Sequence, residues 1–371
     1  MADNEKQRLG SVGLALSGGG FSGAGAATGF ACAIDLLMEN HSITDLAYYS
    51  GISAGALISS FLAAGISPLD MVHGTYNPDF PDFRPFRKFD LYRPNWQELR
   101  TSLRRLRRRT WHRTSGWFRR HKPGNIEKGA DLLPSGILSN ESLKSVVERN
   151  LEHRGKLAFA DLSCHLRVVF YDLLAAERIV AGNGPGEIAT IPIAEAVAAS
   201  AAIPGVFTPR RIQWEGRPLL GVDGGSGGAS IDISDGDRLN VLFVYNHMGY
   251  TARNMAGHIG ALGILDLSRQ LLSNQSNIQE IANYIDAHPA RHVWYYECPS
   301  TKLAGMLSYA AMLTQARETF ELTRAWLSKN IDYFGLVLEE NGITINPAFS
   351  EITFDDIVEK GRLLKGNELS I

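Results

Sequence analysis

The sequence predicts an α/β layered domain whose central sheet is largely parallel or mixed. Short apolar runs of strand length alternate with longer helical stretches through most of the 371 residues. Two of these runs lead directly into a glycine-containing turn that opens a helix, at residues 17–25 and 51–55. Alternating strands and helices are typical of domains in which helices cover a central sheet.

Composition is that of an ordinary globular protein, with 44% hydrophobic and 20% charged residues. The length would allow two domains, but we expect a single domain over residues 1–371. No uncharged apolar run of about 18 residues predicts a spanning helix, and the first eight residues are too polar for a signal peptide. We therefore expect a cytoplasmic protein, although secretion by a signal-independent route would leave no such trace.

Three cysteines, Cys32, Cys164 and Cys298, are far apart in the sequence and have no metal-ligand spacing. Their odd number and separation predict reduced, buried thiols and no metal site. Cys32 lies in an alanine-rich helical stretch, which makes it a poor candidate for a nucleophile.

The first predicted strand, residues 11–16, runs into the glycine loop Ser17–Gly25, and a helix follows to about residue 39. Backbone N–H groups in such a loop could hold a phosphate or an oxyanion. No Gly-Lys-Ser/Thr closes the loop, and no G-x-G-x-x-G with a following acidic residue is present, so we expect no nucleotide cofactor.

Ser53 lies in a predicted sequence of strand, sharp turn and helix. The strand covers residues 45–50, the turn is Gly51-Ile52-Ser53-Ala54-Gly55, and the helix covers residues 54–64. This is the context of a nucleophile elbow, which exposes a serine hydroxyl above a sheet edge. The helix N-terminus would aim its N–H groups at the same place. Alone, the pentapeptide is equally compatible with an ordinary tight turn.

A strongly basic segment follows a proline-rich and aromatic stretch at residues 74–98. Residues 99–122 hold ten Lys or Arg residues and no acidic residue, while Trp96, Leu99, Leu103 and Leu106 recur at helical spacing. One interpretation is an amphipathic helix at an anionic membrane surface. The other is a solvated helix packed on its own domain. The candidate membrane-binding residues are Arg104, Arg105, Arg107, Arg108, Trp111 and Trp117. No recognised nucleic-acid-binding module is visible.

The remaining chain continues the alternation of strands and helices. Strands are predicted at 165–171, 219–222, 240–245 and 292–296, and helices at 139–151, 193–203, 254–286 and 304–329. The strand at 219–222 delivers Asp223 into a glycine-rich turn. An Asp-Gly turn at the surface is the commoner role of that dipeptide.

Two catalytic arrangements are open for Asp223. It could contact Ser53 directly as the base of a dyad, or it could orient a histidine in a Ser-Asp-His triad. His247 follows the strand at 240–245 and is the best histidine for a triad, whereas His292 precedes its strand.

Four sequence blocks together resemble the pattern of the patatin-like phospholipase family. In chain order they are Leu16-Ser17-Gly18-Gly19-Gly20 with Gly23, Gly51-Ile52-Ser53-Ala54-Gly55, residues 199–209 (Ala-Ser-Ala-Ala-Ile-Pro-Gly-Val-Phe-Thr-Pro) and Asp223-Gly224-Gly225. They cover residues 12–225, and the segment 352–361 resembles the last helix of such domains. The resemblance implies a three-layer fold related to α/β-hydrolases, with a mixed sheet between helices.

The resemblance also implies hydrolysis of fatty-acyl esters, usually of phospholipids, without a metal or other cofactor. By position, Ser53 would be the nucleophile, Asp223 the base, and the N–H groups of Gly18, Gly19 and Gly20 the oxyanion hole. The family commonly has arginine where this chain has Ser22, and the basic insertion at about 75–125 lies outside the shared blocks.

We therefore predict a phospholipase A type lipid acyl hydrolase that acts on an anionic phospholipid membrane surface through a Ser53-Asp223 dyad. The alternatives are an α/β-hydrolase esterase with a Ser53-Asp223-His247 triad, and a catalytically silent membrane-binding scaffold. Headgroup preference, oligomeric state and any requirement for an activator are not encoded in a recognisable motif.

Overall fold

The computed structural model describes residues 9–77, 79–87, 93–96, 98–104, 135–227, 231–233, 239–248, 261–299 and 308–365. Its strands are β1 (Leu9–Leu16), β2 (Leu46–Ile52), β3 (Gly136–Leu138), β4 (His165–Asp172), β5 (Glu177–Gly182), β6 (Gly205–Phe207), β7 (Arg210–Trp214), β8 (Arg217–Asp223), β9 (Val241–Met248) and β10 (His292–Pro299). Its helices are α1 (Gly20–Leu37), α2 (Ala54–Ala63), α3 (Pro68–Tyr76), α7 (Glu141–His153), α8 (Ile193–Ser200), α9 (Ala261–Ala287), α10 (Tyr309–Lys329), α11 (Ile331–Glu340) and α12 (Phe354–Lys360).

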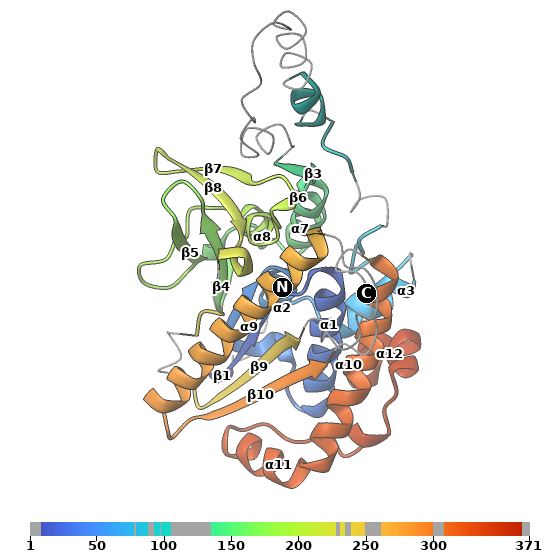
Figure 1. Ribbon diagram of the computed structural model, residues 1–371. Helices are drawn as coiled ribbons and strands as arrows, with labels where there is room; N and C mark the ends of the chain where they lie inside the picture. Colours follow the sequence, from blue (N-terminus) through green and yellow to red (C-terminus); the bar gives the residue numbers. More distant parts are fainter. Residues whose placement is uncertain are drawn as a thin grey trace, which may run out of the picture.

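Eight of the described strands form one mixed sheet in the order β10-β9-β1-β2-β4-β8-β7, with β5 also paired to β4 (Figure 1). The strands from β10 to β4 run parallel to one another. Strands β5, β8 and β7 are antiparallel to their neighbours. The predicted fold class, a mixed sheet between helices, is confirmed.

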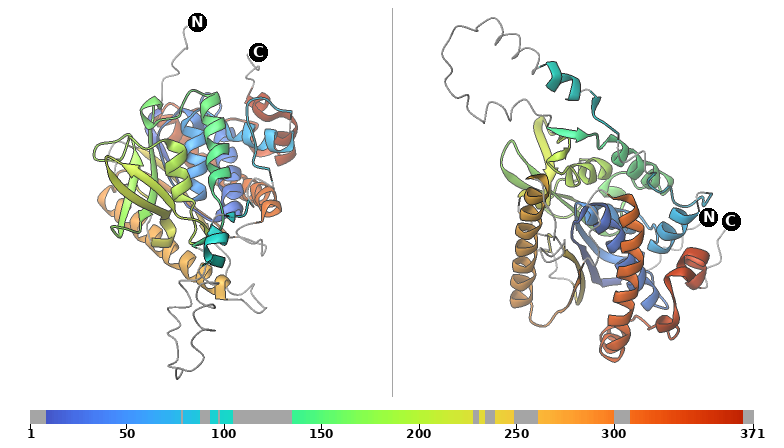
Figure 2. Two further views of the ribbon diagram at one scale, coloured as in Figure 1. Left: turned by 90° about the horizontal axis from the view of Figure 1, so that it is seen from above. Right: turned by 45° about the vertical axis from the view of Figure 1, so that its right-hand side comes forward.

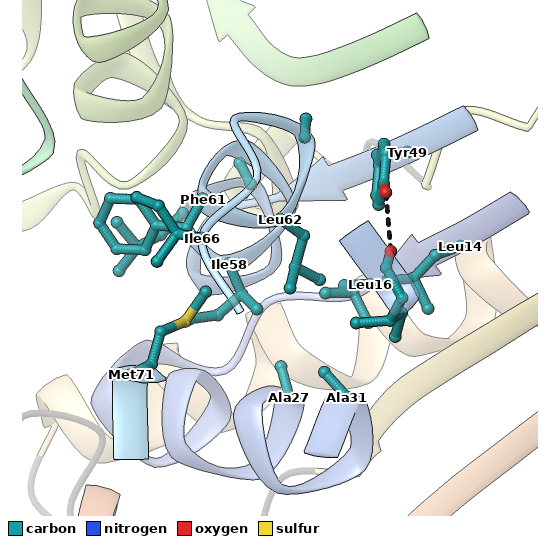
Figure 3. Close-up of a cluster of buried hydrophobic side chains, with 14 of the residues drawn as sticks. Leu14, Leu16, Ala27, Ala31, Tyr49, Ile58, Phe61, Leu62, Ile66 and Met71 are labelled. Carbon is teal, nitrogen blue, oxygen red and sulfur yellow. Dashed lines mark hydrogen bonds between the residues drawn. The ribbon is translucent and has the colours of Figure 1, made fainter. Parts of the chain in front are cut away.

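Helices cover both faces of the sheet. Figure 2 shows α9 on one side of the strands and α1 with α10 on the other. The side chains of β1 alternate accordingly, because Leu14 and Leu16 belong to the larger buried cluster and Ala15 to the smaller one. In Figure 3, Leu14 and Leu16 lie near Ala27 and Ala31 of α1. Successive residues of a strand point to opposite faces, so each strand contributes to two cores.

Helix α1 is the apolar centre of the larger core. It is long and apolar enough to cross a membrane, yet 94% of it is buried inside the fold. A Cβ at Gly25 would lie 1.9 Å from the Met312 carbonyl oxygen, and one at Gly29 would lie 2.1 Å from the Ala316 carbonyl oxygen. The two glycines therefore let α10 pack directly on the backbone of α1.

Parallel pairing brings the ends of three strands to one sheet edge. Leu16 at the end of β1 pairs with Gly51 of β2 and with Tyr245 of β9. Because parallel strands end at the same edge, the segments that follow β1, β2 and β9 are neighbours in space. The glycine loop follows β1, Ser53 follows β2, and His247 is the last but one residue of β9.

Several smaller elements extend beyond the sequence predictions. Strands β3, β5, β6 and β7 and helices α3 and α11 were not predicted, and α8 ends at Ser200 rather than at residue 203. The last predicted helix is confirmed as α12. It is capped by Thr353, whose hydroxyl accepts from the Asp356 N–H while the Asp356 carboxylate accepts from the Thr353 N–H. Such a reciprocal capping box fixes the start of a helix.

Candidate active site

Ser53 occupies a strained position between β2 and α2. Its backbone has φ 56° and ψ −120°, a conformation that costs a non-glycine residue about 1–3 kcal/mol. A Cβ at Gly51 would lie 2.5 Å from the Ala56 nitrogen, and one at Gly55 would lie 2.1 Å from the Leu16 carbonyl oxygen. Neither position can carry a side chain without a backbone shift, so the pentapeptide has the backbone geometry of a nucleophile elbow rather than that of an ordinary turn.

Ser200, the last residue of α8, is hydrogen-bonded to the backbone of this turn. The Ser53 N–H donates to the Ser200 hydroxyl oxygen at 2.7 Å, and that hydroxyl donates to the Val169 carbonyl of β4 at 2.6 Å. Ser200 is fully buried. It therefore links the strained residue to the neighbouring strand, a role that the sequence analysis did not assign to it.

The glycine loop lies directly beside Ser53. A Cβ at Gly18 would lie 3.0 Å from the Ser53 Cβ. Gly19 and Gly20 have φ values of 138° and 63°, which L side chains rarely adopt. Helix α1 begins at Gly20 and α2 at Ala54, so two helix N-termini, each with a positive dipole end, meet at Ser53.

Ser22 stabilises this loop at the position where the family commonly has arginine. Its side chain is 3% exposed, and its hydroxyl donates to the Gly19 carbonyl at 3.0 Å. The Gly23 N–H donates to the same carbonyl at 3.0 Å. The loop is therefore held by local hydrogen bonds that need no arginine.

Asp223 ends β8 and is fully buried. It pairs with Phe170 of β4, and the preceding residue Val169 pairs with Ile52. Strand β8 runs antiparallel to β4 and approaches the edge where β2 ends from the opposite direction. Its last residue, Asp223, is the one that reaches this edge. The Asp223 N–H donates to the Ala202 carbonyl at 3.0 Å. Complete burial and this register distinguish Asp223 from a surface Asp-Gly turn.

A polar cleft contains both candidate catalytic residues. It holds about 370 Å³ of space, open solvent included. Its described lining is Ser17, Gly18, Gly19, Ile52, Ser53, Asp223, Gly225, His247, Ser273, Asn274 and Asn277. The structure thus brings Ser53, Asp223, Gly18 and Gly19 together. Helix α9 contributes Ser273, Asn274 and Asn277, which the sequence analysis did not single out.

His247 lies in the same cleft, packed on the glycine loop. A Cβ at Gly19 would lie 2.3 Å from the His247 Cδ2 atom. The imidazole Nδ1 forms a hydrogen bond of 3.2 Å with the Tyr245 hydroxyl. Burial lowers the pKa of His247 to about 4, so the ring is neutral near pH 7. A base with so low a pKa is poorly matched to proton transfer at neutral pH.

On its other side, Ser53 lines an apolar cavity, which we call the first apolar cavity. It holds about 530 Å³ of space, open solvent included. The described lining is Gly20, Phe21, Ala24, Ser53, Ala54, Leu57, Ser139, Leu143, Ala201, Ile203 and Phe207. Gly20, the third glycine of the predicted oxyanion hole, therefore faces this cavity. Ser53 stands at the boundary between a polar and an apolar space.

Most of the basic segment lies outside the described residues. This applies to Arg105, Arg107, Arg108, Trp111 and Trp117. Arg104 is described and exposed. Trp96 and Leu103, two residues of the predicted apolar stripe, are each 64% exposed. Leu99, a third residue of the stripe, is half-buried. Trp96 and Leu103 are therefore not packed on the domain.

Cys32 and Cys164 are buried thiols outside any disulfide, as predicted, and the side chain of Cys298 lies outside the described residues. Burial, with a smaller contribution from the charge of Asp35, raises the pKa of the Cys32 thiol well above its usual value. A buried thiol of raised pKa is a poor nucleophile. In the part of the chain that the structure describes, no group of three or more His, Cys, Asp or Glu side chains is arranged to hold a metal ion.

Comparison with known proteins identifies the family. A family model described as patatin-like phospholipase matches residues 14–233, more than half of the chain. No curated protein sequence matches the chain. VipD from Legionella pneumophila is 14% identical, with a TM-score of 0.34 over 85% of this chain and 67% of VipD.

A second solved structure is the heterodimeric ExoU–SpcU complex from the type III secretion system of Pseudomonas aeruginosa. The match is 14% identical, with a TM-score of 0.29 over 96% of this chain and 66% of that chain. The chain thus spans about two thirds of the length of both solved chains. Since the family match includes the glycine loop, the Ser53 elbow and Asp223, the resemblance of the four sequence blocks is confirmed, and the chain belongs to the patatin-like phospholipases, a family of lipid acyl hydrolases.

Proposed function

We propose that this protein is a phospholipase A type enzyme that cleaves fatty-acyl esters of membrane phospholipids. The observation that carries the proposal is the position of Ser53, which lines both the polar cleft and the first apolar cavity. A phospholipid ester has the same division, because its ester group joins a polar headgroup side to an apolar chain. The substrate carbonyl would thus lie at Ser53, with the glycerol side in the cleft and the acyl chain in the cavity.

In the proposed reaction, Asp223 accepts the Ser53 proton as the serine Oγ attacks the ester carbonyl. Backbone N–H groups of Gly18, Gly19 and Gly20 hold the oxyanion, assisted by the dipoles of α1 and α2. The alcohol leaves with a proton returned from Asp223, and an acyl-enzyme remains. Water, deprotonated by Asp223, then attacks the acyl carbon. The bond between the acyl carbon and Ser53 Oγ breaks, Oγ takes the proton back from Asp223, and the fatty acid is released.

The contacts of His247 favour a dyad over a triad. A triad histidine needs one ring nitrogen for the serine and the other for the aspartate. Here Nδ1 is hydrogen-bonded to Tyr245, and burial depresses the pKa of the ring to about 4. The His247 ring is better explained as the packing partner of Gly19, which it contacts closely.

The test is fatty-acid release from mixed anionic phospholipid vesicles by wild type and His247→Ala, with Ser53→Ala as the blank. We expect His247→Ala to retain activity within about tenfold, whereas removal of a general base costs about 10²–10⁴-fold. Circular dichroism establishes that the variant is folded. A folded but inactive His247→Ala would replace the dyad with the triad. A wild type that releases no fatty acid from any ester, with or without added cell extract as a source of activator, would favour the silent scaffold.

We further propose that the basic segment holds the enzyme at an anionic membrane surface from the cytoplasmic side. The exposure of Trp96 and Leu103 next to Arg104 supports this, because apolar side chains beside arginines fit the membrane interface. Changing Arg104, Arg105, Arg107 and Arg108 to Gln should weaken binding to anionic vesicles by roughly fivefold for each arginine that contacts the surface.

Sedimentation with vesicles measures this effect, and zwitterionic vesicles are the control. The loss should shrink as salt is added, since salt screens exposed charges. Unchanged binding to anionic vesicles at low salt would exclude a membrane role for these arginines.

A further inference from the structure

A second apolar cavity lies behind the first. It is lined by α1, α2, α3, α10 and α12 together with Phe83 and Phe86, and it holds about 530 Å³ of space, open solvent included. Thr28, Phe61, Thr75, Met312 and Phe354 are part of its described lining. Figure 3 shows Phe61 close to two further lining residues, Ile58 and Met71.

The two cavities share a wall made by Ala24 and Leu57. Ser53, which directly precedes α2, lines the first cavity; Leu57 of α2 lines both, and Phe61 of α2 lines the second. Residues four apart lie on one face of a helix, so this face leads from the first cavity to the second over about 12 Å. On α1, Ala24 likewise lines both cavities, and Thr28, four residues later, lines the second.

The chemistry of the second cavity suits an alkyl chain. Its two threonine hydroxyls are bonded to their own helices, because Thr28 donates to the Ala24 carbonyl at 2.8 Å and Thr75 donates to the Met71 carbonyl at 2.6 Å. Both threonines can therefore present their methyl groups to a ligand. Phe61, Met312 and Phe354 offer apolar surface. A long unbranched chain would gain by displacing solvent from such a space.

We propose that the acyl chain of the substrate runs from Ser53 through the first apolar cavity, past Ala24 and Leu57, into the second apolar cavity. This inference rests on the proposed function, since the ester carbonyl must sit at Ser53. Its consequence is selectivity for long acyl chains. Each additional buried methylene should raise kcat/KM by about fourfold until the second cavity is filled.

The test compares Thr75→Trp with a matched control, Thr314→Trp. Thr75 is half-buried on α3 and lines the second cavity far from Ser53. Thr314 is half-buried on α10, and its hydroxyl likewise donates to a carbonyl four residues earlier, that of Ala310. Thr314 is not among the described lining of either cavity.

Hydrolysis of butyryl, octanoyl, lauroyl and palmitoyl 4-nitrophenyl esters in the same detergent micelles gives the chain-length profile. Thr75→Trp should lower the palmitoyl-to-butyryl ratio of kcat/KM by at least about tenfold, and Thr314→Trp should keep the wild-type ratio. A second readout is independent of catalysis: in the Ser53→Ala background, Thr75→Trp should weaken binding of a fluorescent long-chain fatty acid and Thr314→Trp should not.

Failure of this inference and failure of the proposed function are distinguishable. Cleavage of all four esters with the same chain-length profile in wild type and Thr75→Trp would overturn the acyl path while the hydrolase stands. If no ester is cleaved but Thr75→Trp selectively loses fatty-acid binding, the cavities hold an acyl chain and the proposed hydrolysis is wrong.

Discussion

Ser53→Ala is expected to abolish fatty-acid release, and Asp223→Asn to reduce it severely. Loss of a serine nucleophile lowers kcat on the order of 10⁶-fold in a well-studied serine protease. Loss of a general base lowers the rate by about 10²–10⁴-fold. Asparagine has nearly the shape of aspartate, so Asp223→Asn removes the proton acceptor while filling the same buried space. Titration of released fatty acid from phospholipid vesicles measures both losses.

The chain offers matched controls for both substitutions. Ser59 is a fully buried serine of α2 whose hydroxyl donates to the Ser50 carbonyl at 3.0 Å. Asp172 is a fully buried carboxylate of β4 that pairs with Arg217 at 3.3 Å. Ser59→Ala and Asp172→Asn should each lower stability by about 1–3 kcal/mol but keep the specific activity of the folded protein. Fatty-acid release by Ser53→Ala above the release from vesicles without enzyme would exclude Ser53 as the nucleophile.

The sequence was sufficient to predict the surroundings of Ser53 because its motif is local. Gly51 and Gly55 are needed where the chain turns against itself and against β1, and both lie within two residues of Ser53. The position of Asp223 at the end of a strand was also predicted from sequence. The direction of that strand was not, because pairing of β8 with β4 depends on segments about 50 residues apart.

Parts of the site that depend on tertiary packing could not be predicted. Ser200 is one hydroxyl in an alanine-rich helix, and nothing in the local pattern indicates that it accepts the Ser53 N–H. Asn277 lies more than 200 residues after Ser53, on a helix whose placement across the sheet decides which side chains reach the cleft. One local signal could have pointed to Ser200: it is a polar residue at the end of an otherwise apolar α8.

A buried network of ion pairs connects the sheet to the segment 231–233. Arg167 of β4 is 5% exposed; its guanidinium pairs with Glu187 and, at 2.7 Å, with Asp232. The second oxygen of Asp232 pairs with Arg178 at 2.9 Å. The Tyr48 hydroxyl donates to the Asp232 backbone carbonyl at 2.7 Å. The network thus fastens the segment 231–233, which follows Asp223 in the chain, to β2 and β4.

Replacing Arg167 with Met is expected to lower the free energy of unfolding by about 3–5 kcal/mol. The loss is large because Glu187 and Asp232 would keep their charges in a buried site without their shared cation. Methionine fills much of the same volume, so the effect reports charge rather than a cavity. Urea unfolding followed by circular dichroism measures the change.

Arg178→Met is the matched control, because Arg178 also pairs with Asp232 but its side chain is 33% exposed. Arg178 stays partly solvated, and Arg167 still pairs with Asp232 in this variant, so Arg178→Met should lose far less unfolding free energy than Arg167→Met.

The pH dependence of the free energy of unfolding is a second test of this ionic network. Burial alone would raise the pKa of Glu187, but hydrogen bonds from His165 and the Gly184 N–H, with the charge of Arg167, lower it overall. A depressed carboxyl pKa stabilises the fold above the unfolded value of roughly 4.3, and this stability is lost as the pH falls through the folded pKa. The difference between wild type and Arg167→Met should therefore narrow as the pH falls below about 4. Two results would contradict this: equal losses of unfolding free energy in Arg167→Met and Arg178→Met, or a difference between wild type and Arg167→Met that does not change with pH. Either would mean that packing of the Arg167 side chain rather than its charge holds this segment to the sheet.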